Sequence, residues 1–183
     1  MAVSLLGKLL RKVRPDENRS SWYAPELAAE ETLQVQSTAF QDGQAIPLTH
    51  SGKGRGDNLS PALSWSQAPA GTKQLLLIIE DIDVPLPRPI IHTIAALSPS
   101  LLGLPEGSLN QEDENIRFLP ASFGSHGYAG PRPLPGHGVH RYGFQLFALD
   151  RPLGEEPKNV AALLELVRGH VLARGRLTGI QEG

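Results

Sequence analysis

The 183-residue chain is long enough to bury a hydrophobic core, and its 40% hydrophobic and 20% charged residues suit one globular domain. It has no cysteine, which excludes a disulfide framework, a thiolate metal site and a cysteine nucleophile, and fits a cytoplasmic protein. The formal net charge of −2 and the scattered basic residues give no indication of a nucleic-acid partner.

Residues 1–14 place leucines and Val13 at helical spacing, with lysines and arginines on the other face. We expect an amphipathic helix here, which either packs on the domain or lies on a membrane surface. A cryptic targeting peptide is a third interpretation, although Lys8 interrupts the apolar core that a secretory signal needs. No stretch approaches the roughly 20 apolar residues that span a bilayer. Residues 15–31 form a polar connection, which divides the chain into an N-terminal segment, 1–32, and a domain, 33–183.

Short apolar segments between turn residues indicate a β-rich domain. The alternation of side chains that should face the core with polar side chains predicts a half-buried strand from residue 33 to 38. Shorter strands are expected at 46–49 and 63–65. Longer apolar runs predict strands at 75–79, 89–97 and 143–149, and the first of these should be buried on both faces. The glycine-rich residues 51–58 lack the lysine and spacing of a P-loop and are interpreted as a turn.

A helical period appears only late in the chain, over residues 157–171, before a closing segment at 172–180. A parallel α/β sheet would need helices between its strands, and the pattern shows none there. The predicted fold is therefore mainly β, a β-rich α+β domain.

Ionisable side chains stand where two of the predicted strands meet rigid loops. Asp81 and Asp83 follow one strand, and His140 and Tyr142 precede another. A period of two would place each pair on one face, and two carboxylates that close need a raised pKa or a cationic neighbour. The alternative for the acids is a pair that caps the turn before Pro85.

His92, in the next apolar run, is either a satisfied core residue or the partner of an aspartate. Backbone N–H groups around Gly136 and Gly138 are candidates for an anion-binding nest. Metal binding by the histidines and aspartates is a weaker hypothesis, because no HxH or HExxH spacing occurs. Serine catalysis by Ser122 or Ser125 lacks the GxSxG elbow.

Several motifs stand together in the order and spacing of a known family. They are Asn58–Trp65, Ala68–Lys73, Asp81–Pro85, His92 and Gly130–Tyr142. On these motifs, residues 33–181 resemble the phosphatidylethanolamine-binding proteins (the PEBP family), and more closely their microbial branch. The chain departs from the family pattern at Ile82, Thr93 and Leu134, positions that border the expected site.

The resemblance implies a large central antiparallel sheet packed on a smaller one, with peripheral helices toward the C-terminus. It implies an anion pocket built from seven residues: Asp81, Asp83, His92, Gly130, Pro131, His140 and Tyr142. It also implies a cis peptide bond between Val84 and Pro85.

The expected ligand is a phosphate-bearing small molecule or a phospholipid headgroup, bound without a cofactor or metal. Modulation of a protease or a kinase is a further expectation from the family, and peripheral membrane contact is an expectation from the N-terminal amphipathic segment. The alternative function is a small-molecule enzyme that uses Asp81, Asp83, His92 and His140 for general acid–base catalysis, in an isomerisation or a cyclisation.

Overall fold

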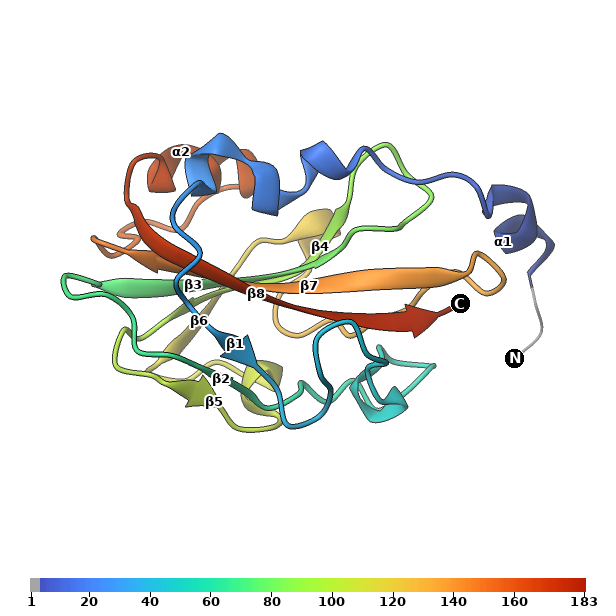
Figure 1. The fold of residues 1–183 in the computed structure, drawn as a ribbon, viewed down its shortest axis with the longest axis horizontal. Coiled ribbons are helices and arrows are strands. Elements are labelled where there is room, and N and C mark those ends of the chain that lie inside the picture. The colour runs from blue at the N-terminus through green and yellow to red at the C-terminus, as the bar shows by residue number, and fades with distance from the viewer. Residues whose placement is uncertain (1–3) are drawn as a thin grey trace.

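The computed structural model describes residues 4–183, and these form three layers (Figure 1). A five-stranded antiparallel sheet lies in the middle, in the order β6-β4-β3-β7-β8. A three-stranded sheet, β1-β2-β5, packs on one face of it. The N-terminal turns and helix α2 cover the other face. The predicted mainly-β fold with two packed sheets is confirmed.

The bounds of the strands and helices are as follows. The central sheet contains β3 (Gln74–Asp81), β4 (Ile90–Leu97), β6 (Ile116–Leu119), β7 (Val139–Leu149) and β8 (Val171–Glu182). The smaller sheet contains β1 (Val35–Gln36), β2 (Leu63–Trp65) and β5 (Gly103–Leu104). The α-helices are α1 (Leu5–Leu10) and α2 (Val160–Val167). The 3₁₀ turns are η1 (Glu17–Arg19), η2 (Ser21–Tyr23), η3 (Pro25–Leu27), η4 (Leu48–His50), η5 (Ser108–Asn110) and η6 (Ser122–Gly124).

Both faces of the central sheet are buried, which explains the continuous apolar run of β3. Leu75, Leu77 and Ile79 face the smaller sheet. Leu76 and Ile78 face the opposite layer. Alternation along a strand therefore sends odd-numbered and even-numbered residues of β3 into two separate hydrophobic clusters.

The N-terminal connection is part of the second cluster rather than a loose linker. Trp22 and Leu27 are 3% and 0% exposed. Beneath them the buried carboxylate of Glu80 accepts hydrogen bonds from Ser20, from the backbone and hydroxyl of Ser21, and from Gln145. Because a buried carboxylate needs several donors, this network ties the η2 turn to β3 and β7.

Four local predictions differ from the structure. Residues 46–49 do not form a strand, because Leu48–His50 is a 3₁₀ turn. The strand predicted at 33–38 is reduced to Val35–Gln36. The late helix ends at Val167, before Gly169 with φ of 75°, and β8 takes the residues after it. The structure describes no cis peptide bond, and after a trans Val84–Pro85 bond the chain turns as the Leu86 N–H donates to the Val84 carbonyl at 2.8 Å.

The predicted helix at residues 1–14 is present over Leu5–Leu10, and Met1–Val3 lie outside the described residues. The expectation that its leucines pack on the domain is wrong. Leu5, Leu6 and Leu9 are 85%, 55% and 80% exposed. None of the helices formed by residues 4–183 is long and apolar enough to span a membrane.

Candidate functional site

Three neighbouring strands bring four of the predicted residues to one face of the central sheet. Asp81 at the end of β3 pairs with Tyr142 of β7, and His140 stands two residues before Tyr142. His92 lies where the β3–β4 register shifts between Ile79 and Glu80. The His92 ring meets the Tyr142 ring edge-on, with the ring centroids 5.6 Å apart. The His140 ring stacks on the Tyr142 ring, with the centroids 6.4 Å apart.

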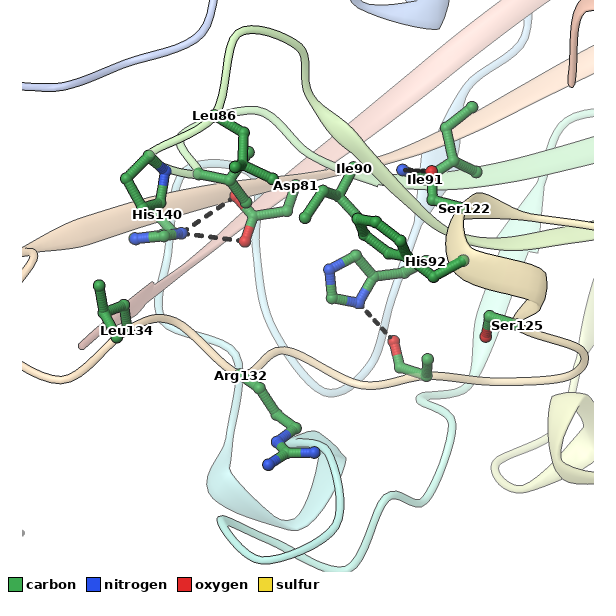
Figure 2. A pocket seen from close by; sticks show the side chains of 14 residues that line it. Asp81, Leu86, Ile90, Ile91, His92, Ser122, Ser125, Arg132, Leu134 and His140 are labelled. Atoms are coloured by element: carbon green, nitrogen blue, oxygen red, sulfur yellow. Dashed lines mark hydrogen bonds and ion pairs between the residues drawn. The ribbon is translucent and has the colours of Figure 1, made fainter.

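A pocket of about 500 Å³ opens beside these rings (Figure 2). Its ionisable lining residues are Asp81, His92, Arg132 and His140. Most of its wall is apolar and includes Val84, Leu86, Ile90, Phe123 and Leu134. A volume of this size fits a small organic molecule rather than a bare inorganic ion.

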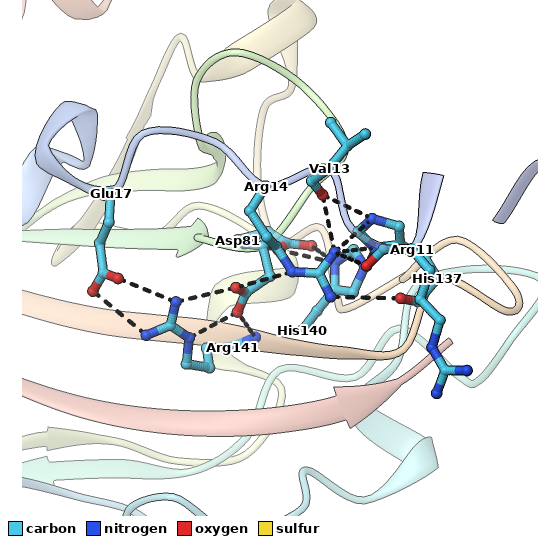
Figure 3. Close-up of polar contacts among 9 residues, drawn as sticks. Arg11, Val13, Arg14, Glu17, Asp81, His137, His140 and Arg141 are labelled. Carbon is cyan, nitrogen blue, oxygen red and sulfur yellow. Dashed lines mark hydrogen bonds and ion pairs between the residues drawn. The ribbon is translucent and has the colours of Figure 1, made fainter. Parts of the chain in front are cut away.

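A continuous chain of hydrogen bonds leads from Asp81 away from the pocket (Figure 3). The Nδ1 atom of His140 lies 2.9 Å from Asp81 Oδ2, and its Nε2 atom lies 2.7 Å from Nδ1 of His137. The Nη1 atom of Arg14 lies 2.7 Å from Nε2 of His137. All these bonds are satisfied if His140 Nδ1–H donates to Asp81, His137 Nδ1–H donates to His140, and Arg14 donates to His137.

In that arrangement the Nε2 atom of His137 accepts from Arg14 and carries no proton, so the His137 ring is neutral. Burial lowers the pKa of His137, and the positive charge of Arg14 lowers it further. The chain therefore joins Asp81 at one end to the guanidinium of Arg14 at the other through two histidine rings. His137 was not singled out from the sequence, although it stands three residues before His140 in the same glycine-rich loop.

His92 is held in one tautomer by its surroundings. Its Nδ1 atom lies 2.9 Å from the Ala129 carbonyl, so Nδ1 carries the proton and donates it. Burial lowers the pKa of His92, although the charge of Asp81 opposes that effect. The neutral ring thus keeps an unprotonated Nε2, which becomes a donor only if a ligand brings a compensating charge.

The hydroxyl of Tyr142 is buried and makes no hydrogen bond of good geometry within residues 4–183, although the Asp81 carboxylate and the Arg132 backbone lie near it. Burial raises the pKa of Tyr142, and the nearby Asp81 carboxylate raises it further, so the phenol stays protonated. Most buried polar groups in native proteins are paired, so an unpaired phenol beside the pocket indicates a group that a ligand or water satisfies.

Asp83 does not line the pocket, so the expectation that it shares a face with Asp81 is wrong. The strand ends at Asp81, whose Oδ1 accepts the Asp83 N–H at 3.0 Å and turns the chain. Asp83 instead accepts hydrogen bonds from the backbone and side chain of Arg141, which alternates to the opposite face from His140 and Tyr142. Arg14 lies 3.5 Å from Asp83 on the same side.

Gly130 and Pro131 do not line the pocket; they hold the loop that contains its lining residues Ala129 and Arg132. The Gly130 N–H donates to the side chain of Asn58, and the Pro131 carbonyl accepts from the N–H of Gly52. Gly130 itself lines a neighbouring hollow that shares Ala129 and Arg132 with the main pocket. The Gly130 N–H is thus already used, and Arg132, which the sequence did not single out, is the cation of the pocket.

Ser122 and Ser125 line the pocket, but in residues 4–183 neither is hydrogen-bonded to a histidine. Ser122 Oγ instead accepts the backbone N–H of Ile91 at 3.0 Å. Within the same residues no group of three or more histidine and acidic side chains is arranged to hold a metal ion.

Comparison with known proteins identifies the family. The family model described as phosphatidylethanolamine-binding protein matches residues 36–182. A UPF0098 protein of Chlamydia muridarum is 38% identical over 156 residues, which cover 82% of this chain and 99% of that protein. A UPF0098 protein of Aquifex aeolicus is 33% identical over 157 residues, covering 81% and 87%.

Two solved structures have the same architecture. A PEBP homologue of Chlamydia trachomatis superposes with a TM-score of 0.73 at 35% identity, covering 84% of this chain and 99% of that one. YbcL of Escherichia coli superposes with a TM-score of 0.74 at 24% identity, covering 82% and 98%, and at that identity it supports the fold alone. The chain therefore belongs to the phosphatidylethanolamine-binding protein family.

Proposed function

We propose that the pocket binds a small amphiphilic ligand whose head carries a phosphate and an ammonium group, as in a phosphoethanolamine headgroup. The observation that carries the proposal is the buried, unpartnered hydroxyl of Tyr142 beside Asp81 and His92. A polar atom left unsatisfied in the free protein costs folding free energy, and a ligand that accepts its hydrogen bond recovers that cost.

The charges in the pocket favour a zwitterion over a simple anion. Asp81 would repel a phosphate, whereas an ammonium group next to Asp81 and a phosphate next to Arg132 would both be attracted. The apolar wall around Leu86, Phe123 and Leu134 would accept the carbon portion of such a molecule.

Ligand binding is tested by calorimetric titration with glycerophosphoethanolamine, whose phosphodiester charge stays constant across the histidine range. We expect Tyr142→Phe and Arg132→Gln each to weaken binding about tenfold, because each loses a hydrogen bond to the head. Tyr23→Phe and Arg19→Gln are matched controls away from the pocket and should bind as the wild type does. Equal affinities for all five proteins would refute the proposal.

Protonation provides a second test in the same titration. Burial lowers the pKa of His92, and a phosphate beside it would raise that pKa again, so binding takes up a proton. Affinity should therefore be higher at about pH 5.5 than at about pH 8, across the ordinary titration range of histidine. If Nε2 of His92 faces the ligand, His92→Gln should remove most of this difference; pH-independent binding would show that His92 stays neutral in the complex.

An enzyme is the second candidate, and one observation favours it. Asp81 lines the pocket and is hydrogen-bonded to the His140–His137 chain, and a carboxylate oriented in this way suits proton exchange with a small metabolite. Incubation with candidate metabolites, followed by NMR, tests this function. Turnover that is abolished by His140→Ala would support catalysis. Binding of a metabolite without any turnover would support the binding function and contradict catalysis.

A further inference from the structure

Helix α1 stands at one end of the molecule (Figure 1). Gly7 is the buried residue of this helix, and a Cβ atom there would collide with the carbonyl of Pro135. The backbone N–H of Ser4 donates to the same carbonyl at 3.3 Å. The residue before Pro135 is Leu134, which lines the pocket, so α1 is attached to the outside of a pocket wall.

The leucines of α1 point away from that contact. Leu5, Leu6 and Leu9 lie at positions i, i+1 and i+4, within about 100° of arc on a helix, and Gly7 lies on the opposite side. All three are more than half exposed, at 85%, 55% and 80%. A six-residue helix with this much exposed leucine surface gains nothing from that surface in the free protein.

The charges around the leucines have one sign. Lys8, Arg11 and Lys12 are exposed in and just after the helix, with Arg11 on the Gly7 side near Gly138, and no acidic residue precedes Asp16 in the sequence. Apolar side chains flanked by lysine and arginine are the pattern of a segment that lies in the interface of an anionic bilayer. A symmetric contact between two copies of this surface would bring like charges together, which disfavours a dimer.

The helix is also separate from the part of the chain that defines the fold. The family match begins at residue 36, and both hydrophobic clusters form without any residue of α1. Neither the core nor the pocket therefore explains why the leucines are there.

We propose that α1 docks the protein on the surface of an anionic membrane, with Leu5, Leu6 and Leu9 among the acyl chains and Lys8, Arg11 and Lys12 at the headgroups. The docking surface is thus defined by these six residues. The proposal does not depend on which ligand the pocket takes.

The test is co-sedimentation of the full chain with phosphatidylcholine vesicles, with and without an equal share of phosphatidylglycerol. One variant carries Leu5→Ser, Leu6→Ser and Leu9→Ser, and a second carries Lys8→Gln, Arg11→Gln and Lys12→Gln. The matched controls are Leu48→Ser with Leu102→Ser, and Lys53→Gln with Lys158→Gln, all at exposed positions elsewhere.

We expect the wild type and both controls to bind the vesicles that contain phosphatidylglycerol. The leucine variant should bind at least about tenfold more weakly, because three apolar side chains no longer enter the interface. The charge variant should lose roughly fivefold for each charge removed, and added salt should reproduce that loss. Both variants should keep the unfolding temperature and the glycerophosphoethanolamine affinity of the wild type, which separates membrane docking from ligand binding.

Three results would overturn the proposal. The first is failure of the wild type to bind the anionic vesicles. The second is binding of the leucine variant to these vesicles as strongly as the wild type binds. The third is a concentration-dependent dimer that the leucine variant abolishes while vesicle binding is unchanged, since the surface would then serve a second copy.

Discussion

Asp83 is held as a carboxylate although its side chain is only 9% exposed. Burial by itself would raise its pKa, but hydrogen bonds from Arg141 and the charges of Arg141 and Arg14 outweigh burial and hold the pKa below its ordinary value. A carboxylate with a lowered pKa stabilises the fold at pH values above its unfolded pKa of about 3.9, and that contribution is lost as the pH falls through the lowered value.

Asp83→Asn should therefore lower the free energy of unfolding by about 1–3 kcal/mol near neutral pH, an amount reduced because Arg141 is partly exposed to solvent. Its stability should also fall less steeply than that of the wild type below about pH 4. Urea unfolding of both proteins across this pH range measures the two slopes. Parallel curves would contradict the role assigned to the Asp83–Arg141 pair.

At the scale of single elements, β3, β4 and β7 build the site because their alternation directs the polar ends of all three strands to one face. β8 has a different role, since its glycines let the segments before and after β1 approach the sheet. Gly175 lies under the carbonyl of Leu33, and Gly179 lies under Ile46. These residues have no side chain because the neighbouring layer occupies the space.

Gly175→Ala should lower the free energy of unfolding by about 1–3 kcal/mol, because the new methyl group would meet the backbone carbonyl of Leu33. Gly154→Ala is the control, since a Cβ atom there meets nothing within 4 Å. Thermal and chemical unfolding of the two variants compares them directly. An unchanged Gly175→Ala would mean that the Leu33 segment moves aside without cost.

At the scale of the whole molecule, the N-terminal segment completes the core from outside the family match. Trp22 and Leu27 belong to the cluster that also contains Ile78 and Phe147. Ser20 and Ser21 supply donors to the buried carboxylate of Glu80. The division of the chain at residue 32 stays a prediction about domains, but the structure shows that the two parts share one core.

Two truncations should show how much each part of the N-terminal segment contributes to stability. A chain that lacks residues 1–10 should keep its unfolding temperature, because α1 contributes little buried surface. A chain that lacks residues 1–28 should unfold at least about 10 °C lower, since it exposes part of the core and leaves Glu80 short of donors. Differential scanning calorimetry measures both; a small shift for the longer truncation would show that the cluster closes without Trp22 and Leu27.

The sequence by itself determined the features that depend on local spacing. The apolar runs predicted β3, β4 and β7, because a strand buried on both faces must be apolar at successive positions. The spacing of two between His140 and Tyr142 predicted their common face, since side chains alternate along a strand.

The tertiary structure decided whatever depends on where the chain turns and which segments meet. Asp83 leaves the face of Asp81 because a side-chain hydrogen bond ends the strand between them. The chain through His140, His137 and Arg14 joins residues that are more than 120 positions apart, which no local pattern encodes. Leu5, Leu6 and Leu9 of α1 remain exposed because the helix meets the body through Gly7, where the carbonyl of Pro135 leaves no room for a side chain.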